Sequence, residues 1–314
     1  MRTKYVGGVE VSALCLGTLP FGKYVDQATS FAILDRFAEA GGTFLDTANN
    51  YVFWDGGTGD ESEETVGRWM AARGNRDSLV VATKVGARPR TPGTGLDNAE
   101  GLAGDTIRAA AEGSLKRLGT DRIDVYYSHV EDRGVPLEDT LGGFASLVEA
   151  GAVREIACSN HATWRIAQAH AVSRANGWPR YAAVQMRHSY LRPRPGARLP
   201  EAGHALMTEE LFDYAAADGD LALVSYGSLL FGGYAGKPLP EAYDHPGTTG
   251  RLAVLREVAA ESGATPNQVV LAWLLGKGVI PVVGVSSVAQ VEEAVGGVAL
   301  ELDDEQVARL DEPS

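Results

Sequence analysis

Residues 105–158 read DTIRAAAEGSLKRLGTDRIDVYYSHVEDRGVPLEDTLGGFASLVEAGAVREIAC and alternate twice between a helical pattern and a strand pattern. Apolar positions recur with helical spacing over Asp105 to Leu118 and over Leu137 to Glu149. Each helical run leads into a short apolar stretch, first Ile123 to Ser128 and then Val153 to Cys158. Strands joined by helices in this way lie parallel, with right-handed crossovers. The stretch therefore predicts an α/β fold built on a parallel sheet.

The same alternation runs over the rest of the chain and reaches eight strands. The expected strands are Leu14 to Gly17, Thr43 to Asp46, Leu79 to Lys84, Ile123 to Ser128, Val153 to Cys158, Ala182 to Met186, Leu221 to Ser225, and Val279 to Val283. The expected helices are Thr29 to Ala40, Ser62 to Ala72, Asp105 to Leu118, Leu137 to Glu149, Trp164 to Ala175, Glu209 to Ala217, Pro266 to Leu275, and Val288 to Val295, with a possible extra helix at Val254 to Ala260. Such a sheet loses its exposed edges by closing into a barrel. We predict a single (β/α)₈ TIM barrel domain over residues 1–314.

The segment before the first strand turns at Val6-Gly7-Gly8-Val9, which predicts an N-terminal β-hairpin that closes one end of the barrel. An open doubly wound sheet is the competing fold. That fold would show a GxGxxG phosphate turn after the first strand, and the sequence there is LCLGTLPFG. Three long connections rich in Gly and Pro, at residues 86–104, 188–206 and 226–250, follow strand ends. Loops at that end of a barrel build the active site.

Composition narrows the class of protein. The formal net charge of -13 argues against nucleic acid or an anionic membrane surface as the main partner, because both require clustered positive charge. Cys15 and Cys158 each lie in an apolar run, which favours two buried thiols over a disulfide or a metal site. No stretch approaches the roughly 20 apolar residues that span a bilayer, and the N-terminus lacks the apolar core of a signal peptide. We expect a cytoplasmic protein without a metal centre.

Polar side chains stand where several of the predicted strands end. Asp46, Lys84 and His129 end or follow three consecutive strands, and Tyr51 lies five residues after Asp46. Any one of them alone has a simpler explanation, such as a helix cap or a solvated lysine. Because the carboxyl ends of barrel strands converge on one mouth, we expect the four side chains to share a site.

These four residue types together can transfer a proton. A tyrosine acts as a general acid if its pKa of about 10 moves toward the working pH, and a neighbouring ammonium favours the phenolate. Lys84 can supply that ammonium, and the carboxylate of Asp46 would keep it charged in a partly dry pocket. His129 could then bind and orient a substrate oxygen.

The sequence resembles the aldo-keto reductase superfamily over essentially its whole length. The motifs that carry the resemblance are FLDTANNY, VVATKVG, SLKRLGTDRIDVYYSH and VREIACSN, which occur in the family's order. The resemblance implies an oxidoreductase that interconverts a carbonyl compound, such as an aldehyde, ketone or sugar, with its alcohol by direct hydride transfer. It implies Tyr51 as the general acid and base, Lys84 and Asp46 as the pair that tunes it, and His129 as the group that orients the carbonyl.

The resemblance also implies a bound nicotinamide cofactor, NADP or NAD. Its nicotinamide end would contact Ser159, Asn160 and Gln185 and stack on Tyr226. Its ribose and pyrophosphate would approach Gly17, Thr18, Gly227, Ser228 and Leu229. Its adenosine end would lie near Gly284, Ser286, Gln290 and Glu293. At Gly284, Ser286 and Gln290 the family commonly places basic residues that bind the 2′-phosphate of NADP, so the preference between the two cofactors stays open.

The substrate pocket is less well defined by sequence. Phe53, Trp54, His161 and Tyr190 stand after strand ends or in adjacent loops and are candidates for substrate contact, as is Trp164. Two other functions compete with the enzyme: a dinucleotide-binding, redox-sensing regulatory subunit with little turnover, and a metal-dependent barrel hydrolase. The hydrolase is the weaker, because the six histidines form no HxH pair near a strand end. The pattern is compatible with a monomer and with a homo-oligomer.

Overall fold

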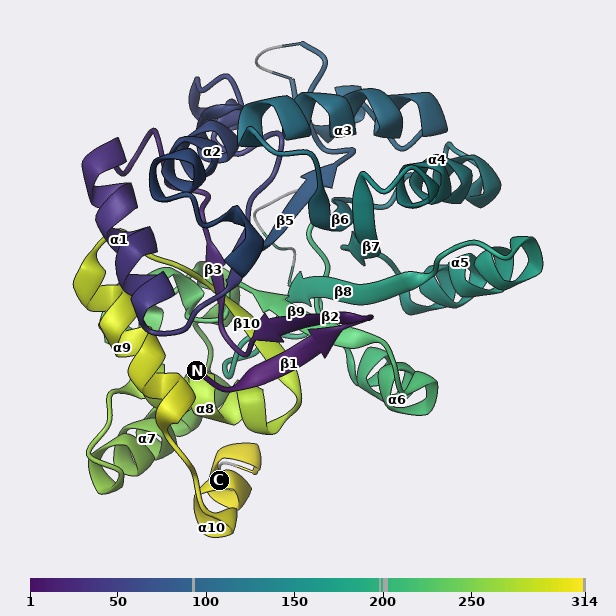
Figure 1. The fold of residues 1–314 in the computed structure, drawn as a ribbon. Coiled ribbons are helices and arrows are strands. Elements are labelled where there is room, and N and C mark those ends of the chain that lie inside the picture. The colour runs from purple at the N-terminus through teal and green to yellow at the C-terminus, as the bar shows by residue number, and fades with distance from the viewer. Residues whose placement is uncertain (92–93, 198, 200–202, 313–314) are drawn as a thin grey trace.

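The computed structural model contains a closed barrel of eight parallel strands in the order β10-β3-β4-β5-β6-β7-β8-β9 (Figure 1). The strands are β3 (Cys15–Gly17), β4 (Phe44–Asp46), β5 (Val80–Val85), β6 (Ile123–Ser128), β7 (Val153–Ser159), β8 (Tyr181–Arg187), β9 (Ala222–Tyr226) and β10 (Val279–Gly284). The structure describes residues 1–91, 94–197, 199 and 203–312. The predicted (β/α)₈ barrel is confirmed. Parts of the predicted loops 86–104 and 188–206, and the last two residues of the predicted domain, lie outside the described residues.

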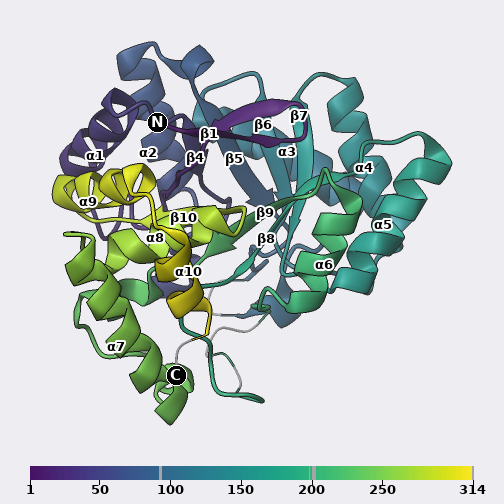
Figure 2. The ribbon, with the colours of Figure 1, turned by 90° about the horizontal axis from the view of Figure 1, so that it is seen from below.

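Helices surround the barrel (Figure 2). They are α1 (Gln27–Glu39), α2 (Glu61–Arg73), α3 (Gly104–Leu118), α4 (Leu137–Glu149), α5 (Thr163–Asn176), α6 (Glu209–Asp218), α7 (Pro246–Glu261), α8 (Pro266–Gly276), α9 (Val288–Ala299) and α10 (Asp304–Asp311). Short 3₁₀ turns include η1 (Phe53–Asp55), η2 (Arg76–Ser78), η3 (Leu96–Asn98), η4 (Leu230–Ala235) and η5 (Glu241–Tyr243). Among the described residues, no helix is both long and apolar enough to cross a membrane.

Local sequence explains where several helices begin and end. The side chain of Thr265 accepts a hydrogen bond from the backbone N–H of Gln268, and the side chain of Gln268 accepts one from the backbone N–H of Thr265. Pro266 occupies the first helical position of α8. Helix α3 ends at Gly119, which has a φ of 62°, a left-handed conformation that glycine adopts without strain. Both helix boundaries therefore follow from the residue types at the caps.

The predicted hairpin is also present, as β1 (Thr3–Val6) and β2 (Val9–Ser12). Val6, Val9 and Val11 are buried in one apolar cluster with residues of the barrel interior, including Phe44 and Val125. Figure 2 shows the hairpin across one end of the barrel, with helix α7 toward the opposite end. The hairpin therefore closes the amino-terminal end of the barrel and leaves the carboxyl ends of the strands for chemistry.

The register of the barrel places the polar strand ends in one rim. Gly17 pairs with Asp46, Ser159 pairs with Gln185, and Arg187 pairs with Tyr226. Because parallel strands all run the same way, their final residues meet at the same mouth. The two cysteines lie deeper, and both are buried free thiols, as predicted.

Candidate active site

Asp46 and Lys84 form a buried ion pair at the centre of the mouth. Lys84 Nζ lies 2.6 Å from Asp46 Oδ2 and donates to the carbonyl oxygen of Thr47 at 2.8 Å. Lys84 is 0% exposed and Asp46 1%, so water screens this pair very little. Asp46 ends β4 and Lys84 lies on the neighbouring β5, and this adjacency in the sheet brings the two charges together.

Tyr51 completes this cluster from the loop that follows β4. Its hydroxyl oxygen lies 2.6 Å from Lys84 Nζ and donates to Asp46 Oδ2 at 3.0 Å. Burial raises the pKa of Tyr51 well above its usual value, and the negative charge of Asp46 raises it further. This direction differs from our sequence-based expectation that Lys84 would lower the pKa, because the expectation did not include the burial of the ring. In this structure Tyr51 keeps its proton at neutral pH and is suited to donate it.

His129 follows β6 and faces the same cluster. Its ring centroid lies 6.1 Å from that of Tyr51 in an edge-to-face arrangement, and its backbone N–H donates to the carbonyl oxygen of Val85. Burial lowers the pKa of His129 well below its usual value, and the nearby Lys84 and His204 lower it further. The imidazole is therefore neutral at physiological pH. Its Nδ1 atom is buried and has no hydrogen-bond partner among the described residues.

The two pKa directions predict a flat pH profile for carbonyl reduction. His129, with a lowered pKa, is neutral above about pH 6.5, and Tyr51, with a raised pKa, is protonated below about pH 10. We therefore expect kcat/KM for reduction to stay level between these limits, as measured by initial rates across buffers of constant ionic strength. A descending limb with an apparent pKa of about 7 to 8 would contradict this and would show that Lys84 controls the phenol.

Three side chains at the ends of β7 and β8 form an adjoining amide-rich surface. Ser159 Oγ donates to the carbonyl oxygen of Gln185 at 2.8 Å, and Gln185 Nε2 donates to Asp46 Oδ1 at 2.9 Å. Asn160 Nδ2 lies 3.0 Å from Ser159 Oγ and donates to the carbonyl oxygen of His129 at 3.1 Å. The structure thus brings together all three residues expected to contact the nicotinamide carboxamide.

Tyr226 lies beside this surface at the end of β9. Its hydroxyl donates to Asn160 Oδ1 at 2.7 Å, and its ring meets the ring of His204 edge to face, with centroids 5.0 Å apart. Hydroxyl and amide groups can both donate to and accept from a carboxamide, and an aromatic ring beside them offers a stacking surface. The chemistry of this donor set therefore fits the nicotinamide end of a dinucleotide.

The residues expected near the ribose and pyrophosphate have different surroundings. Thr18 is fully buried and its hydroxyl contacts Asp46 O and Ser62 Oγ, so its side chain supports the β4 end and does not face the mouth. Gly227 has a φ of 66°, which turns the chain after β9, and the Ser228 side chain donates to the carbonyl oxygen of Ser225 within this turn. At these positions, backbone groups are therefore better placed than side chains to contact a cofactor.

Gly284, Ser286 and Gln290 occupy the end of β10 and the start of α9. A methyl group added at Gly284 would meet nothing within 4 Å, so the strand end faces open space. Gln290 Oε1 accepts from the backbone N–H of Ser286 at 2.7 Å. None of these three residues carries the positive charge that holds a 2′-phosphate.

Glu293 lies one turn further along α9. Its carboxylate accepts from Thr265 Oγ1 at 2.6 Å and from Asn267 Nδ2 at 3.1 Å. These contacts join α9 to the first turn of α8. The carboxylate therefore has a structural role, and its contact with the adenosine end of the cofactor stays a prediction.

Two of the substrate candidates stand at the rim on η1. Trp54 is 63% exposed, and Phe53 is half-buried with the guanidinium of Arg88 5.8 Å from its ring centroid. The exposed indole offers apolar surface that a substrate could cover. The positions of both residues agree with a role in substrate binding.

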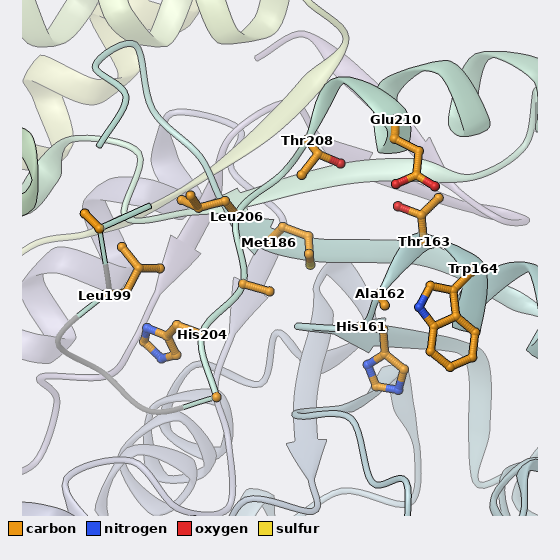
Figure 3. Close-up of a pocket in the computed structure, with 13 residues that line it drawn as sticks. His161, Ala162, Thr163, Trp164, Met186, Leu199, His204, Leu206, Thr208 and Glu210 are labelled. Carbon is orange, nitrogen blue, oxygen red and sulfur yellow. The ribbon is translucent and has the colours of Figure 1, made fainter. Parts of the chain in front are cut away.

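His161 lines a pocket of about 610 Å³ between the start of α5 and residues 203–208. Figure 3 shows the imidazoles of His161 and His204 along this pocket, with Met186 and Trp164 on its other walls. His161 Nδ1 lies 2.8 Å from the carbonyl oxygen of Ser159, so the ring is also tied to β7.

Tyr190 is placed differently from the other candidates. It is 0% exposed, meets the ring of Trp273 edge to face, and has the guanidinium of Arg251 4.5 Å from its ring centroid. Tyr190 therefore belongs to the core between β8 and helices α7 and α8, and we correct our expectation that it contacts substrate. Arg251 lies in the same core.

Sequence reasoning did not single out Arg187, although a signal was available. Side chains alternate along a strand, so Arg187 faces the same side as Gln185, one step nearer the mouth. Arg187 is 1% exposed. A buried arginine two residues beyond a predicted cofactor contact is unusual enough to notice.

Comparison with known proteins identifies similar reductases and a similar fold. The sequence profile of the aldo/keto reductase family matches residues 13–314. A norsolorinic acid reductase of Emericella nidulans is 34% identical, over 98% of this chain and 79% of that protein. An uncharacterised oxidoreductase of Bacillus subtilis, YrpG, is 33% identical, over 99% of this chain and 95% of that protein. The crystal structure of a thermostable aldo-keto reductase with the inhibitor epalrestat superposes with a TM-score of 0.77 at 26% identity, covering 99% of both chains.

Proposed function

Because the chain belongs to the aldo/keto reductase family and its relatives include oxidoreductases, we propose that it reduces a small-molecule carbonyl compound to an alcohol at Tyr51. The observation that carries the proposal is the buried cluster in which the Tyr51 hydroxyl lies 2.6 Å from Lys84 Nζ and 3.0 Å from Asp46 Oδ2. We assign this activity to a single barrel domain in a reducing compartment such as the cytoplasm, in keeping with its two free thiols.

Each residue of the cluster has a defined part in the reaction. His129 binds the carbonyl oxygen of the substrate and holds it beside the Tyr51 hydroxyl. Tyr51 transfers its proton to that oxygen, which becomes the alcohol hydroxyl. Lys84 stabilises the phenolate that remains, and Asp46 holds the ammonium in place through their ion pair. In the oxidative direction Tyr51 takes the proton back.

A nicotinamide dinucleotide, when bound, supplies the hydride for the carbonyl carbon. Ser159, Asn160 and Gln185 would hold its carboxamide, and Tyr226 would stack on its ring. Gly227 to Leu229 would follow its phosphates, and the open space beyond Gly284 would take its adenosine end. The side chains expected at the nicotinamide end are neutral, as are those of Ser286 and Gln290 at the adenosine end.

We predict little discrimination between NADP and NAD, and one substitution should shift it toward NADP. Gln290→Arg places a cation on the first turn of α9, and a charge-assisted contact with the 2′-phosphate should shift the ratio of the Kd values for NADPH and NADH toward NADPH by about tenfold to hundredfold. Calorimetry with both reduced cofactors measures this. Ala289→Arg, which adds the same charge at the adjacent exposed position, should shift the ratio by less than about threefold. A wild-type preference for NADPH above about a hundredfold would show that another cation holds the phosphate.

The substrate class follows from the site and its relatives. A neutral His129 and a protonated Tyr51 suit an uncharged carbonyl oxygen, as in an aldehyde, ketone or sugar. The name of one relative states that it reduces norsolorinic acid, which supports the reductive direction. The test is consumption of reduced cofactor with a panel of aldehydes, ketones and sugars. Tight cofactor binding without turnover on any of them would support the redox-sensing alternative.

A further inference from the structure

Arg187 places a buried cation at the mouth, in a position that the proton-transfer cluster does not use. It is the last residue of β8 and pairs in register with Tyr226 of β9. Its side chain faces the same side as Gln185, about 6 to 7 Å further along the strand direction. If Gln185 contacts the nicotinamide end of the cofactor, Arg187 therefore lies two residues further along β8, closer to the open end of the barrel.

The neighbours of Arg187 belong to the segment expected to follow the cofactor phosphates. A methyl group added at Gly227 would lie 3.7 Å from Arg187 Cγ and 3.9 Å from Nε. The guanidinium carbon lies 5.5 Å from the ring centroid of Phe231 and 5.7 Å from that of Tyr243. Two aromatic faces therefore hold the planar guanidinium in place beside the turn after β9.

The backbone of this turn has the form of an anion-binding concavity. Leu229 has a φ of -105° and a ψ of 17°, whereas Leu230 and Phe231 have φ values of 46° and 55°. A right-handed residue followed by left-handed residues points backbone N–H groups toward one point. The N–H of Leu230 donates to the carbonyl oxygen of Gly227 at 3.0 Å, which leaves the N–H groups of Leu229 and Phe231 for an anion. Phe231 is also 62% exposed, so its ring can move off the guanidinium when a ligand enters.

A cation beside the turn after β9 would favour the binding of an anionic cofactor to this acidic chain. A dinucleotide carries a pyrophosphate, and the chain has a formal net charge of -13. Gly284, Ser286 and Gln290 bring no positive charge to the adenosine end. Arg187 stands beside Gly227.

We propose that Arg187 is a cofactor-binding residue whose guanidinium binds the pyrophosphate of the dinucleotide, together with the backbone N–H groups of Leu229 and Phe231. This inference rests on the proposed function, since it assumes a nicotinamide dinucleotide. In this proposal, Arg187 at the end of β8 supplies a positive charge for the cofactor, which the residues at the start of α9 do not supply. A planar guanidinium suits this task because it can donate two hydrogen bonds to one phosphate.

The test is calorimetric binding of ADP-ribose, NADH and NADPH to the full chain. ADP-ribose contains the pyrophosphate but no nicotinamide. Arg187→Met should weaken the binding of all three by about tenfold to hundredfold, because the pyrophosphate is common to them. Arg187→Lys, which keeps the charge but not the planar fork, should lie between wild type and Arg187→Met. Where the methionine variant does not fold, Arg187→Gln takes its place as the uncharged variant.

Arg192→Met is the matched control. Arg192 follows the same strand, its side chain is 58% exposed, and it pairs with Glu209, so its loss should leave every Kd unchanged. An ADP-ribose Kd for folded Arg187→Met within about twofold of wild type would overturn the proposal, as would equal losses in Arg187→Lys and Arg187→Met. If the wild type turns over but Arg187→Met binds normally, this inference alone fails. If the wild type binds none of the three ligands, the proposed function fails with it.

Discussion

Tyr51→Phe is expected to lower kcat for carbonyl reduction by about 10²-fold to 10⁴-fold, the usual contribution of a positioned general acid. The substitution removes the hydroxyl that lies 2.6 Å from Lys84 and 3.0 Å from Asp46 and leaves the buried ring. Water reaches this position poorly, because Tyr51 is only 8% exposed, so no other donor replaces the phenol. Initial rates at saturating cofactor and substrate measure the loss.

The control for this prediction is Tyr24→Phe. The hydroxyl of Tyr24 also donates to a carboxylate, that of Asp55, but its side chain is exposed and lies outside the cluster. Tyr24→Phe should keep wild-type kcat, and Tyr51→Phe should keep the wild-type Kd for the cofactor. If Tyr51→Phe retained more than about a tenth of the wild-type rate, Tyr51 would not be the proton donor.

Lys84→Met should have the largest effect on stability. It leaves the carboxylate of Asp46 buried without its ammonium partner, and removing one member of a buried ion pair typically lowers the free energy of unfolding by about 3–5 kcal/mol. The same change should lower kcat by about a hundredfold or more, because the phenolate of Tyr51 loses its stabilising charge. Urea denaturation and initial rates measure the two effects.

The double variant Asp46→Asn with Lys84→Met separates stability from chemistry. It removes both charges, so the free energy of unfolding should recover toward the wild-type value while kcat stays low. Lys277→Met is the control for loss of a lysine: Lys277 pairs with Asp311 near the surface, and such pairs contribute about 1 kcal/mol or less. A Lys84→Met protein as stable as Lys277→Met would show that the buried pair does not support the fold.

Most of the barrel could be predicted because periodicity reports which face of each element is buried. Helix α4 was predicted at its observed bounds, since its apolar stripe begins and ends with the helix. The prediction for α7 began eight residues too late, because Pro246 and Gly247 look like loop residues although proline suits a first helical turn. Helix α10 was missed because it is short and highly charged, and its cap at Asp303 is its clearest signal.

The sequence could predict the site residues that stand at strand ends. It could not predict the properties that depend on how deeply a side chain is buried. Asp46, Lys84 and His129 could be found because parallel strands end together. The direction of the Tyr51 pKa shift could not, since it follows from the dry surroundings of the ring. For the same reason Tyr190 could not be assigned to the core from its position after β8, and Arg187 was overlooked.

Reduction at Tyr51 should transfer a hydride from the cofactor to the carbonyl carbon and the phenol proton to the carbonyl oxygen. The most direct measurement uses reduced cofactor that carries deuterium at the transferable position, with an aldehyde substrate and mass spectrometry of the product. We expect the wild type to form an alcohol with one deuterium on the former carbonyl carbon, and Tyr51→Phe to form almost none of this product in the same time. A wild type that binds the cofactor tightly but forms no deuterated alcohol from any aldehyde, ketone or sugar tested would contradict this expectation.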